Sequence, residues 1–211
     1  MNYENLFAER IGGNQYGKST AIYKFEKIKR AKQKARQLHP ELEILDFGVG
    51  EPDQLSPEIV RETMKQSVDQ MNNRGYADNG TELFSDAAAL YMKTFFDIDV
   101  NASTQINHCL GIKSALSMLP LAFVNEGDLV FQTVPGYPVM ATHTRYLGGD
   151  VIDIPLLEEN GFLPDLSSID PEVEKKCKLF YINYPNNPTG AVATDAFYDE
   201  LIAFAKEYNI N

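Results

Sequence analysis

A pair of asparagines enclosed by prolines follows an apolar segment of the sequence. The segment KLFYINYPNNPTG runs from Lys178 to Gly190 and places Asn187 between Pro185 and Pro188. Because proline fixes its own φ angle, an amide in such a loop can bind a ligand with little further loss of conformational entropy. Asn187 is therefore a candidate ligand-binding residue, although the same pattern also fits a turn that caps the next helix.

A glycine at the start of an expected helix forms a second candidate site. In HCLGIKSAL (residues 108–116), a strand is expected to end at Gly111 and a helix to begin with Ile112 and Lys113. The free N–H groups and the dipole of a helix N-terminus attract an anion, and the lysine adds a full positive charge. The spacing is not that of a Walker loop. Taken alone, the stretch fits an anion site and an ordinary strand-to-helix turn equally well.

A third candidate is a tyrosine held between two prolines. The segment VPGYPV (residues 134–139) places Tyr137 between Gly136 and Pro138, and Pro135 comes just before. An aromatic ring clamped after a strand can stack on a planar ligand. A core tyrosine beside a turn is the simpler interpretation of this segment when it is taken alone.

The segment DFGVGEPD (residues 46–53) favours a different class of protein. Its glycines resemble the turn of nucleotide or S-adenosylmethionine binders, so a methyltransferase is an alternative function. The GxGxxG pattern fails, however, because position 53 is aspartate. Pro52 also removes an N–H group that a phosphate would bind.

Alternating apolar segments indicate the fold that positions these loops. Strand-like and helix-like patterns alternate in the second half of the chain, which predicts an α/β fold with a mostly parallel sheet and helices on both faces. The apolar segment LFYINY is expected to be a central strand. Ligands of such sheets bind beyond the carboxyl ends of the strands, where the loops above should lie. Strands are expected near residues 43–47, 105–111, 128–134, 150–156 and 176–184, and helices near residues 24–39, 56–71, 81–96, 112–124, 137–148 and 194–210, with Ser56, Thr81, and Thr194 or Asp195 as N-caps.

The charge balance argues against nucleic acid and anionic membranes as partners. The net charge is -11 and the sequence pI is about 4.7. The segment from Lys24 to His39 runs against this balance, with seven lysines and arginines against Glu26 alone. Its apolar residues recur at helical spacing, so we interpret it as a solvated helix that packs through an apolar stripe.

Cysteine usage and hydropathy favour a cytoplasmic protein. Cys109 and Cys177 are the two cysteines, and neither has a histidine or a second cysteine at metal-ligand spacing. Two free thiols fit a reducing compartment, and no metal site is expected. The N-terminal residues MNYENLFAERIGG have no apolar core, and the longest apolar stretch is too short to span a bilayer.

Taken together, the loops resemble those of the class I/II, fold-type I, pyridoxal-phosphate-dependent aminotransferases. The residues Asn187 to Gly190 are similar to the Asn-Pro-Thr-Gly signature of that family, and the other loops occur in the same order along essentially the whole chain. Within the family, the motifs are most similar to the branch that transaminates LL-diaminopimelate. Aspartate and aromatic specificities are the alternatives.

The resemblance implies a role for each candidate residue. Ile112 and Lys113 would hold the cofactor phosphate through a backbone N–H group and a positive charge. Tyr137 would stack on the pyridine ring, and Asn187 would bind its phenolic oxygen. Tyr76 would reach the phosphate of a neighbouring subunit's cofactor, which implies a homodimer with shared sites. The substrate would contact Tyr23, Gly50, Lys113, Tyr137 and Asn187.

The resemblance also implies a domain division and an activity. Residues 1–45 would form an N-terminal arm and a segment of a small domain, and residues 46–211 the N-terminal part of the large cofactor-binding domain. The lysine that forms an imine with the cofactor is expected beyond Asn211, so no catalytic residue is assigned in this chain. The implied reaction transfers an amino group to 2-oxoglutarate and, for LL-diaminopimelate, yields tetrahydrodipicolinate for lysine synthesis. A non-catalytic half of a transaminase is an alternative.

Overall fold

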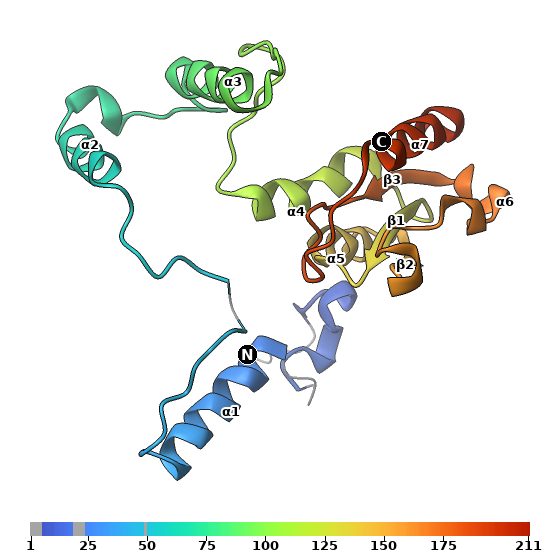
Figure 1. Ribbon diagram of the computed structural model, residues 1–211, viewed down its shortest axis with the longest axis horizontal. Helices are drawn as coiled ribbons and strands as arrows, with labels where there is room; N and C mark the ends of the chain where they lie inside the picture. The colour runs from blue at the N-terminus through green and yellow to red at the C-terminus, as the bar shows by residue number, and fades with distance from the viewer. Residues whose placement is uncertain (1–5, 19–23, 49) are drawn as a thin grey trace. The chain divides into compact units, whose positions relative to one another are not determined.

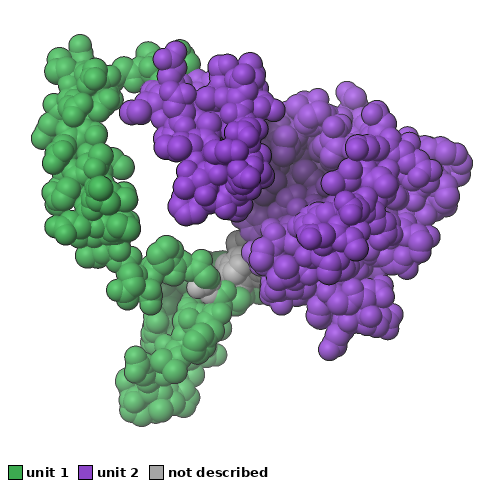
Figure 2. All heavy atoms as spheres, turned by 45° about the horizontal axis from the view of Figure 1, so that its top comes forward, with its two compact units in different colours: residues 1–78 green, residues 79–211 purple. Residues whose placement is uncertain are grey.

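The computed structural model describes residues 6–18, 24–48 and 50–211, and the chain divides into two compact units (Figures 1 and 2). Unit 1 is residues 1–78 and unit 2 is residues 79–211. Unit 1 contains the helices α1 (Lys24–Leu38) and α2 (Glu58–Val68). The expected basic helix is therefore confirmed, but the packing of its apolar stripe is not, since Ile28 and Leu38 are 43% and 62% exposed. The predicted division at residue 45 is a different one and stays a prediction.

The described part of unit 2 contains a parallel sheet of three strands. These are β1 (Leu129–Val134), β2 (Asp150–Pro155) and β3 (Cys177–Tyr181), in the order β2-β1-β3. Val130 of β1 lies opposite Val151 of β2 and Leu179 of β3. The prediction of a mostly parallel sheet is thus confirmed.

One detail of the predicted sheet is wrong, and another stays a prediction. β1 lies between β2 and β3 in the described sheet, and the other side of β3 is hydrogen-bonded to Asn211, so the central position predicted for β3 stays a prediction. Gln132 and Thr133 lower the apolar character of β1, yet both side chains are buried at the centre of the sheet. The strands expected near residues 43–47 and 105–111 are not formed, because in the described structure neither segment pairs with a neighbouring strand.

The two faces of the sheet bury alternate residues of β1. Phe131 packs in a cluster with Cys177 and with Phe197 of helix α7 (Asp195–Tyr208). Val130 faces the opposite way and packs with Met140 of helix α5 (Val139–Tyr146). Because side chains alternate along a strand, these clusters lie on opposite faces, which confirms helices on both faces of the sheet. Figure 1 shows α5 and α7 next to the strands of this sheet.

The remaining helices are α3 (Glu82–Phe96), α4 (Ile112–Phe123) and the short α6 (Pro171–Glu174). α4 packs against α5. Short 3-10 helices lie at Glu9–Ile11, Gly13–Gln15, Met71–Arg74, Glu158–Asn160 and Leu166–Ser168. None of the described helices is long and apolar enough to cross a membrane.

Threonine side chains cap the N-termini of two of these helices, as expected. The side-chain oxygen of Thr81 accepts a hydrogen bond from the N–H group of Phe84, and that of Thr194 accepts from Phe197, each at 3.2 Å. The predicted cap by Ser56 is wrong, because Pro57 occupies the N-cap position of α2. Proline can stand there because its φ of -49° is combined with an extended ψ of 142°.

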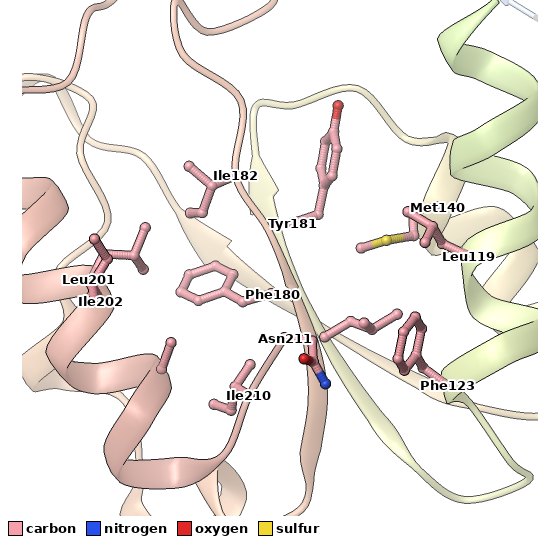
Figure 3. A pocket seen from close by; sticks show the side chains of 12 residues that line it. Leu119, Phe123, Met140, Phe180, Tyr181, Ile182, Leu201, Ile202, Ile210 and Asn211 are labelled. Carbon is pink, nitrogen blue, oxygen red and sulfur yellow. The ribbon is translucent and has the colours of Figure 1, made fainter. Parts of the chain in front are cut away.

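The outer edge of β3 borders an apolar groove. The N–H group of Phe180 donates to the carbonyl oxygen of Asn211 at 2.9 Å, and the N–H group of Asn211 donates to Lys178 at 3.1 Å. A groove of about 510 Å³ opens beside this edge (Figure 3). The groove is lined by Leu119, Phe123, Met140, Leu179, Phe180, Tyr181, Ile182, Leu201, Ile202, Ala205, Ile210 and Asn211.

We predict that the two cysteines react at different rates. Cys109 is exposed, whereas Cys177 is buried and its thiol donates to the carbonyl oxygen of Leu179 at 3.2 Å. Burial raises the pKa of Cys177 to about 11, so little thiolate forms near neutral pH. A thiol reagent should modify Cys109 in the native protein and Cys177 only after unfolding. Intact mass measured over time checks this, and rapid modification of Cys177 in the native protein would contradict it.

The same burial should make the stability fall at high pH. Because the pKa of Cys177 rises from 9.0 to about 11 on folding, the folded state holds this proton more tightly than the unfolded state. This stabilisation is complete below pH 9.0 and is lost as the pH rises towards about 11. Urea denaturation of Cys177→Ala should show a shallower loss of unfolding free energy over this range. Equal slopes of unfolding free energy against pH for Cys177→Ala and the wild-type protein would contradict this prediction.

Candidate functional site

The loops that follow β1 and β3 meet at one edge of the sheet. The strands are adjacent and parallel, so their carboxyl ends lie together. The side-chain Nδ2 of Asn186, after β3, donates to the carbonyl oxygen of Pro135, after β1, at 3.3 Å. The structure therefore brings together the two loops that carry Tyr137 and Asn187.

The loop with Asn187 is closed by its own hydrogen bonds. The N–H group of Gly190 donates to the carbonyl oxygen of Asn186 at 2.7 Å, and that of Asn186 donates to Ala191 at 2.8 Å. The N–H group of Asn187 donates to Oδ1 of Asn183 at 3.2 Å. Asn187 itself is exposed. Its backbone is held while its amide is presented to solvent, as a ligand-binding residue requires.

Tyr137 is half-buried beside a second tyrosine. Burial raises the pKa of Tyr181, at the end of β3, and the nearby Tyr137 raises it further. Gly136 lets the chain pass close to β1, since a Cβ at this position would lie 2.2 Å from the carbonyl oxygen of Thr133. The position of the Tyr137 ring therefore depends on the absence of a side chain at residue 136.

The N-terminus of α4 has the geometry expected of an anion site. Gly111 is the N-cap residue with a φ of 78°, and no side chain among the described residues caps this helix. Ile112 is 71% exposed and Lys113 is also exposed. The first N–H groups of α4 and the lysine charge can therefore reach a bound anion. The hydroxyl of Ser114 donates to the carbonyl oxygen of Gly111 at 2.8 Å, which steadies the turn.

Of the other predicted site residues, two belong to unit 1 and one lies outside the described residues. Tyr76 and Gly50 belong to unit 1; the tyrosine is fully exposed, and no atom lies within 4 Å of a Cβ placed at the glycine. Tyr23 lies outside the described residues. Within the described part of the chain, Lys113 makes no hydrogen bond or ion pair with the loops after β1 and β3. The roles assigned to all these residues stay predictions.

Asn186 is a further residue of these loops that the sequence did not reveal, and it is 3% exposed. Its Oδ1 has no hydrogen-bond partner among the described residues, and the same holds for Oε1 of Gln132 and Oγ1 of Thr133. A buried polar atom without a hydrogen-bond partner lowers the free energy of unfolding by about 1–3 kcal/mol. We therefore expect each of these atoms to bind a ligand or a water molecule. Two polar residues at the end of an otherwise apolar strand were the signal for Gln132 and Thr133. For Asn186, the sequence held no such signal apart from the adjacent Asn187.

These residues fit a cofactor that carries both a phosphate and an aromatic ring, as pyridoxal phosphate does. The uncapped N-terminus of α4 with Lys113 suits the phosphate. The ring of Tyr137 and the exposed amide of Asn187 suit the aromatic part and its polar substituents. No group of histidine, cysteine, aspartate and glutamate within the described ranges could hold a metal ion.

The glycine-rich segment does not form a nucleotide-binding turn. Such a turn needs a strand before it and a helix directly after it. The described residues of DFGVGEPD lie in neither kind of element. The carboxylate of Asp46 instead accepts a hydrogen bond from the N–H group of Gly48 at 3.0 Å and pairs with Lys32. The local structure therefore speaks against the methyltransferase alternative.

A family profile and individual relatives both match this chain to aminotransferases. Residues 43–211 match the sequence profile of the family described as Aminotransferase class I and II. The chain is 51% identical over 209 residues to the LL-diaminopimelate aminotransferase of Methanocaldococcus jannaschii, and 49% identical over 208 residues to that of Methanococcus maripaludis. Each alignment covers 98% of this chain and 50% of the relative, so the chain spans about half the length of these curated relatives.

Solved structures show the same fold. Apo-BacF from Bacillus subtilis is similar with a TM-score of 0.82 and 33% identity, over 91% of this chain and 49% of that chain. An aspartate aminotransferase of Thermus thermophilus has a TM-score of 0.83 over 97% of this chain and 51% of that one. Its identity is 23%, so this likeness concerns the fold alone.

We predict that Gly136→Ala disturbs the Tyr137 loop. The new Cβ would lie 2.2 Å from the carbonyl oxygen of Thr133 and 2.9 Å from Nε2 of Gln132, and a backbone oxygen cannot turn away. We expect the free energy of unfolding to fall by about 1–3 kcal/mol in urea denaturation. Gly75→Ala is the control, because no atom lies within 4 Å of its Cβ. Equal stability of the two variants would show that the close approach is unimportant.

Proposed function

Because the chain belongs to the aminotransferase class I and II family, we propose that it is the cofactor-holding part of an enzyme that transaminates LL-diaminopimelate with pyridoxal phosphate. The proposal of this substrate rests on the 51% identity, over 209 residues, to a relative that is named LL-diaminopimelate aminotransferase. The proposed amino acceptor is 2-oxoglutarate, and the proposed product cyclises to tetrahydrodipicolinate in cytoplasmic lysine synthesis. The activity is proposed for the whole protein, of which this chain corresponds to about half a relative's length.

The loops described above support the proposed binding of the cofactor. When bound, pyridoxal phosphate supplies an electron sink for the carbanion that forms at the substrate Cα. Ile112 and Lys113 would bind its phosphate through a backbone N–H group and a positive charge. Tyr137 would lie against its ring, and Asn187 would donate a hydrogen bond to its phenolic oxygen. The ring would then be fixed in position and orientation before a substrate arrives.

The proposed substrate would contact the residues that the resemblance to aminotransferases implies. Gly50 leaves room for it, since its position is open in the structure. Tyr23 would contact it from the N-terminal part of the chain, and Lys113 would face a carboxylate. Tyr137 and Asn187 would border it as well. The proposal keeps the domain division at residues 1–45 and 46–211.

The proposed enzyme is a homodimer with shared sites. Tyr76 is fully exposed within unit 1, so its hydroxyl is available to another subunit. It would donate a hydrogen bond to the phosphate bound by the neighbouring copy. Each site would then need Tyr76 from one chain and Asn187 from the other, which makes the arrangement testable by mixing variants.

We predict that two defective variants complement each other. Tyr76→Phe and Asn187→Ala should each weaken cofactor binding, measured as circular dichroism induced in the cofactor absorption band. After unfolding and refolding together in equal amounts, about one quarter of the sites should regain wild-type affinity, because half of the dimers contain one intact site. If the mixture shows only the two defective affinities, Tyr76 does not act across subunits.

The proposed donor is tested on protein purified from its natural source, so that any further polypeptide of the enzyme is retained. With pyridoxal phosphate and 2-oxoglutarate present, glutamate should form faster from LL-diaminopimelate than from aspartate or phenylalanine. Faster turnover of aspartate or phenylalanine would favour the other transaminase specificities. Cofactor binding without glutamate formation from any of the three donors would instead favour a non-catalytic half-transaminase.

A further inference from the structure

We propose that Asn186 is a positioning residue, which fastens the loop of Asn187 to the loop of Tyr137 so that both side chains face one ligand together. The inference rests on the proposed function for the identity of that ligand. Asn186 is not itself placed in contact with cofactor or substrate. Its effect would be exerted through the two neighbouring loops.

The side chain of Asn186 makes the hydrogen bond that joins the two loops. Its Nδ2 donates to the carbonyl oxygen of Pro135 at 3.3 Å, across 51 positions of sequence. The same nitrogen donates to Oγ1 of Thr189 at 2.9 Å, within its own loop. The amide N–H groups are thus divided between two segments that follow different strands. Pro135 lies two residues before Tyr137, and Asn186 directly precedes Asn187.

Burial strengthens this link. Asn186 is 3% exposed, so water competes little for its amide. Its backbone is also bonded, through the N–H group to Ala191 at 2.8 Å and through the carbonyl oxygen to Gly190 at 2.7 Å. These backbone bonds do not depend on the side chain. A substitution at this position should therefore keep the turn of residues 186–191 while it removes the connection to Pro135.

The neighbouring Asn183 provides a matched control. Its Oδ1 accepts the hydrogen bond of the Asn187 N–H group at 3.2 Å, entirely within the loop after β3. Asn183→Ala removes a hydrogen bond to the Asn187 backbone but none to the loop after β1. Asn186→Asp is a second variant, because it keeps the size of the side chain and replaces the donating nitrogen with an oxygen that Pro135 would repel.

The first measurement is hydrogen–deuterium exchange of the ligand-free protein. In Asn186→Ala and Asn186→Asp, exchange should become faster in both loops, at residues 134–139 and 182–191. In Asn183→Ala it should become faster at residues 182–191 alone. Unchanged exchange at residues 134–139 in both Asn186 variants would overturn the proposal, whatever ligand the protein binds.

The second measurement is the affinity for pyridoxal phosphate, followed by induced circular dichroism. Asn186→Ala and Asn187→Ala should each weaken binding about tenfold, the effect of one hydrogen bond of about 1.4 kcal/mol. The double variant should lose clearly less affinity than the two single variants together, since part of the effect of Asn186 is exerted through Asn187. Independent effects, about a hundredfold together, would contradict a positioning role. If the wild-type protein binds no pyridoxal phosphate, the proposed function fails, and the exchange measurement alone decides whether Asn186 joins the loops.

Discussion

The parallel pairing of β1 with β3 is the constraint on which the candidate site depends. It brings the carboxyl ends of two strands, separated by more than forty residues of chain, to the same edge of the sheet. The pairing is held by burial on both faces, since Val130 and Phe131 are completely inaccessible to solvent and pack against α5 and α7 respectively. Without this pairing, Tyr137 and Asn187 would belong to unrelated loops.

The edge of the sheet also explains why polar groups are buried there. Gln132 and Thr133 lie near the end of β1, and their side-chain oxygens have no partner among the described residues. Gly136 lets the chain turn tightly over them, and the amide of Asn186 joins the next loop. A protein that served only as a scaffold would gain stability from apolar residues at these positions. We interpret these buried polar groups as part of a preorganised ligand site.

Local patterns predicted much of this arrangement. The alternation of apolar segments predicted β1, β2, β3 and the helices between them, because each element buries a regular face. The threonine caps at residues 81 and 194 were also predictable, since a hydroxyl before an apolar run acts on its own turn. The order of the loops indicated the aminotransferase family, and the match over residues 43–211 confirms that resemblance.

The failures of sequence reasoning share a cause in tertiary structure. Hydropathy did not indicate that Gln132 and Thr133 of β1 are buried, because their burial depends on neighbours that hydropathy does not include. The strand expected at residues 105–111 needed a pairing partner, which no local pattern reveals. Asn186 and Asn187 look alike in sequence. Asn186 is buried because its amide reaches Pro135, 51 positions earlier, whereas Asn187 is exposed.

We propose that the first turn of α4 and the loops after β1 and β3 bind pyridoxal phosphate. Amide chemical shifts recorded in an isotope-labelled sample while the cofactor is added would test this binding. We expect the largest shifts at Ile112, Lys113, Tyr137 and Asn187, and we expect them to saturate together with one affinity. The proposal would be contradicted by shifts confined to the apolar groove beside β3, or by no saturable shift at these four residues.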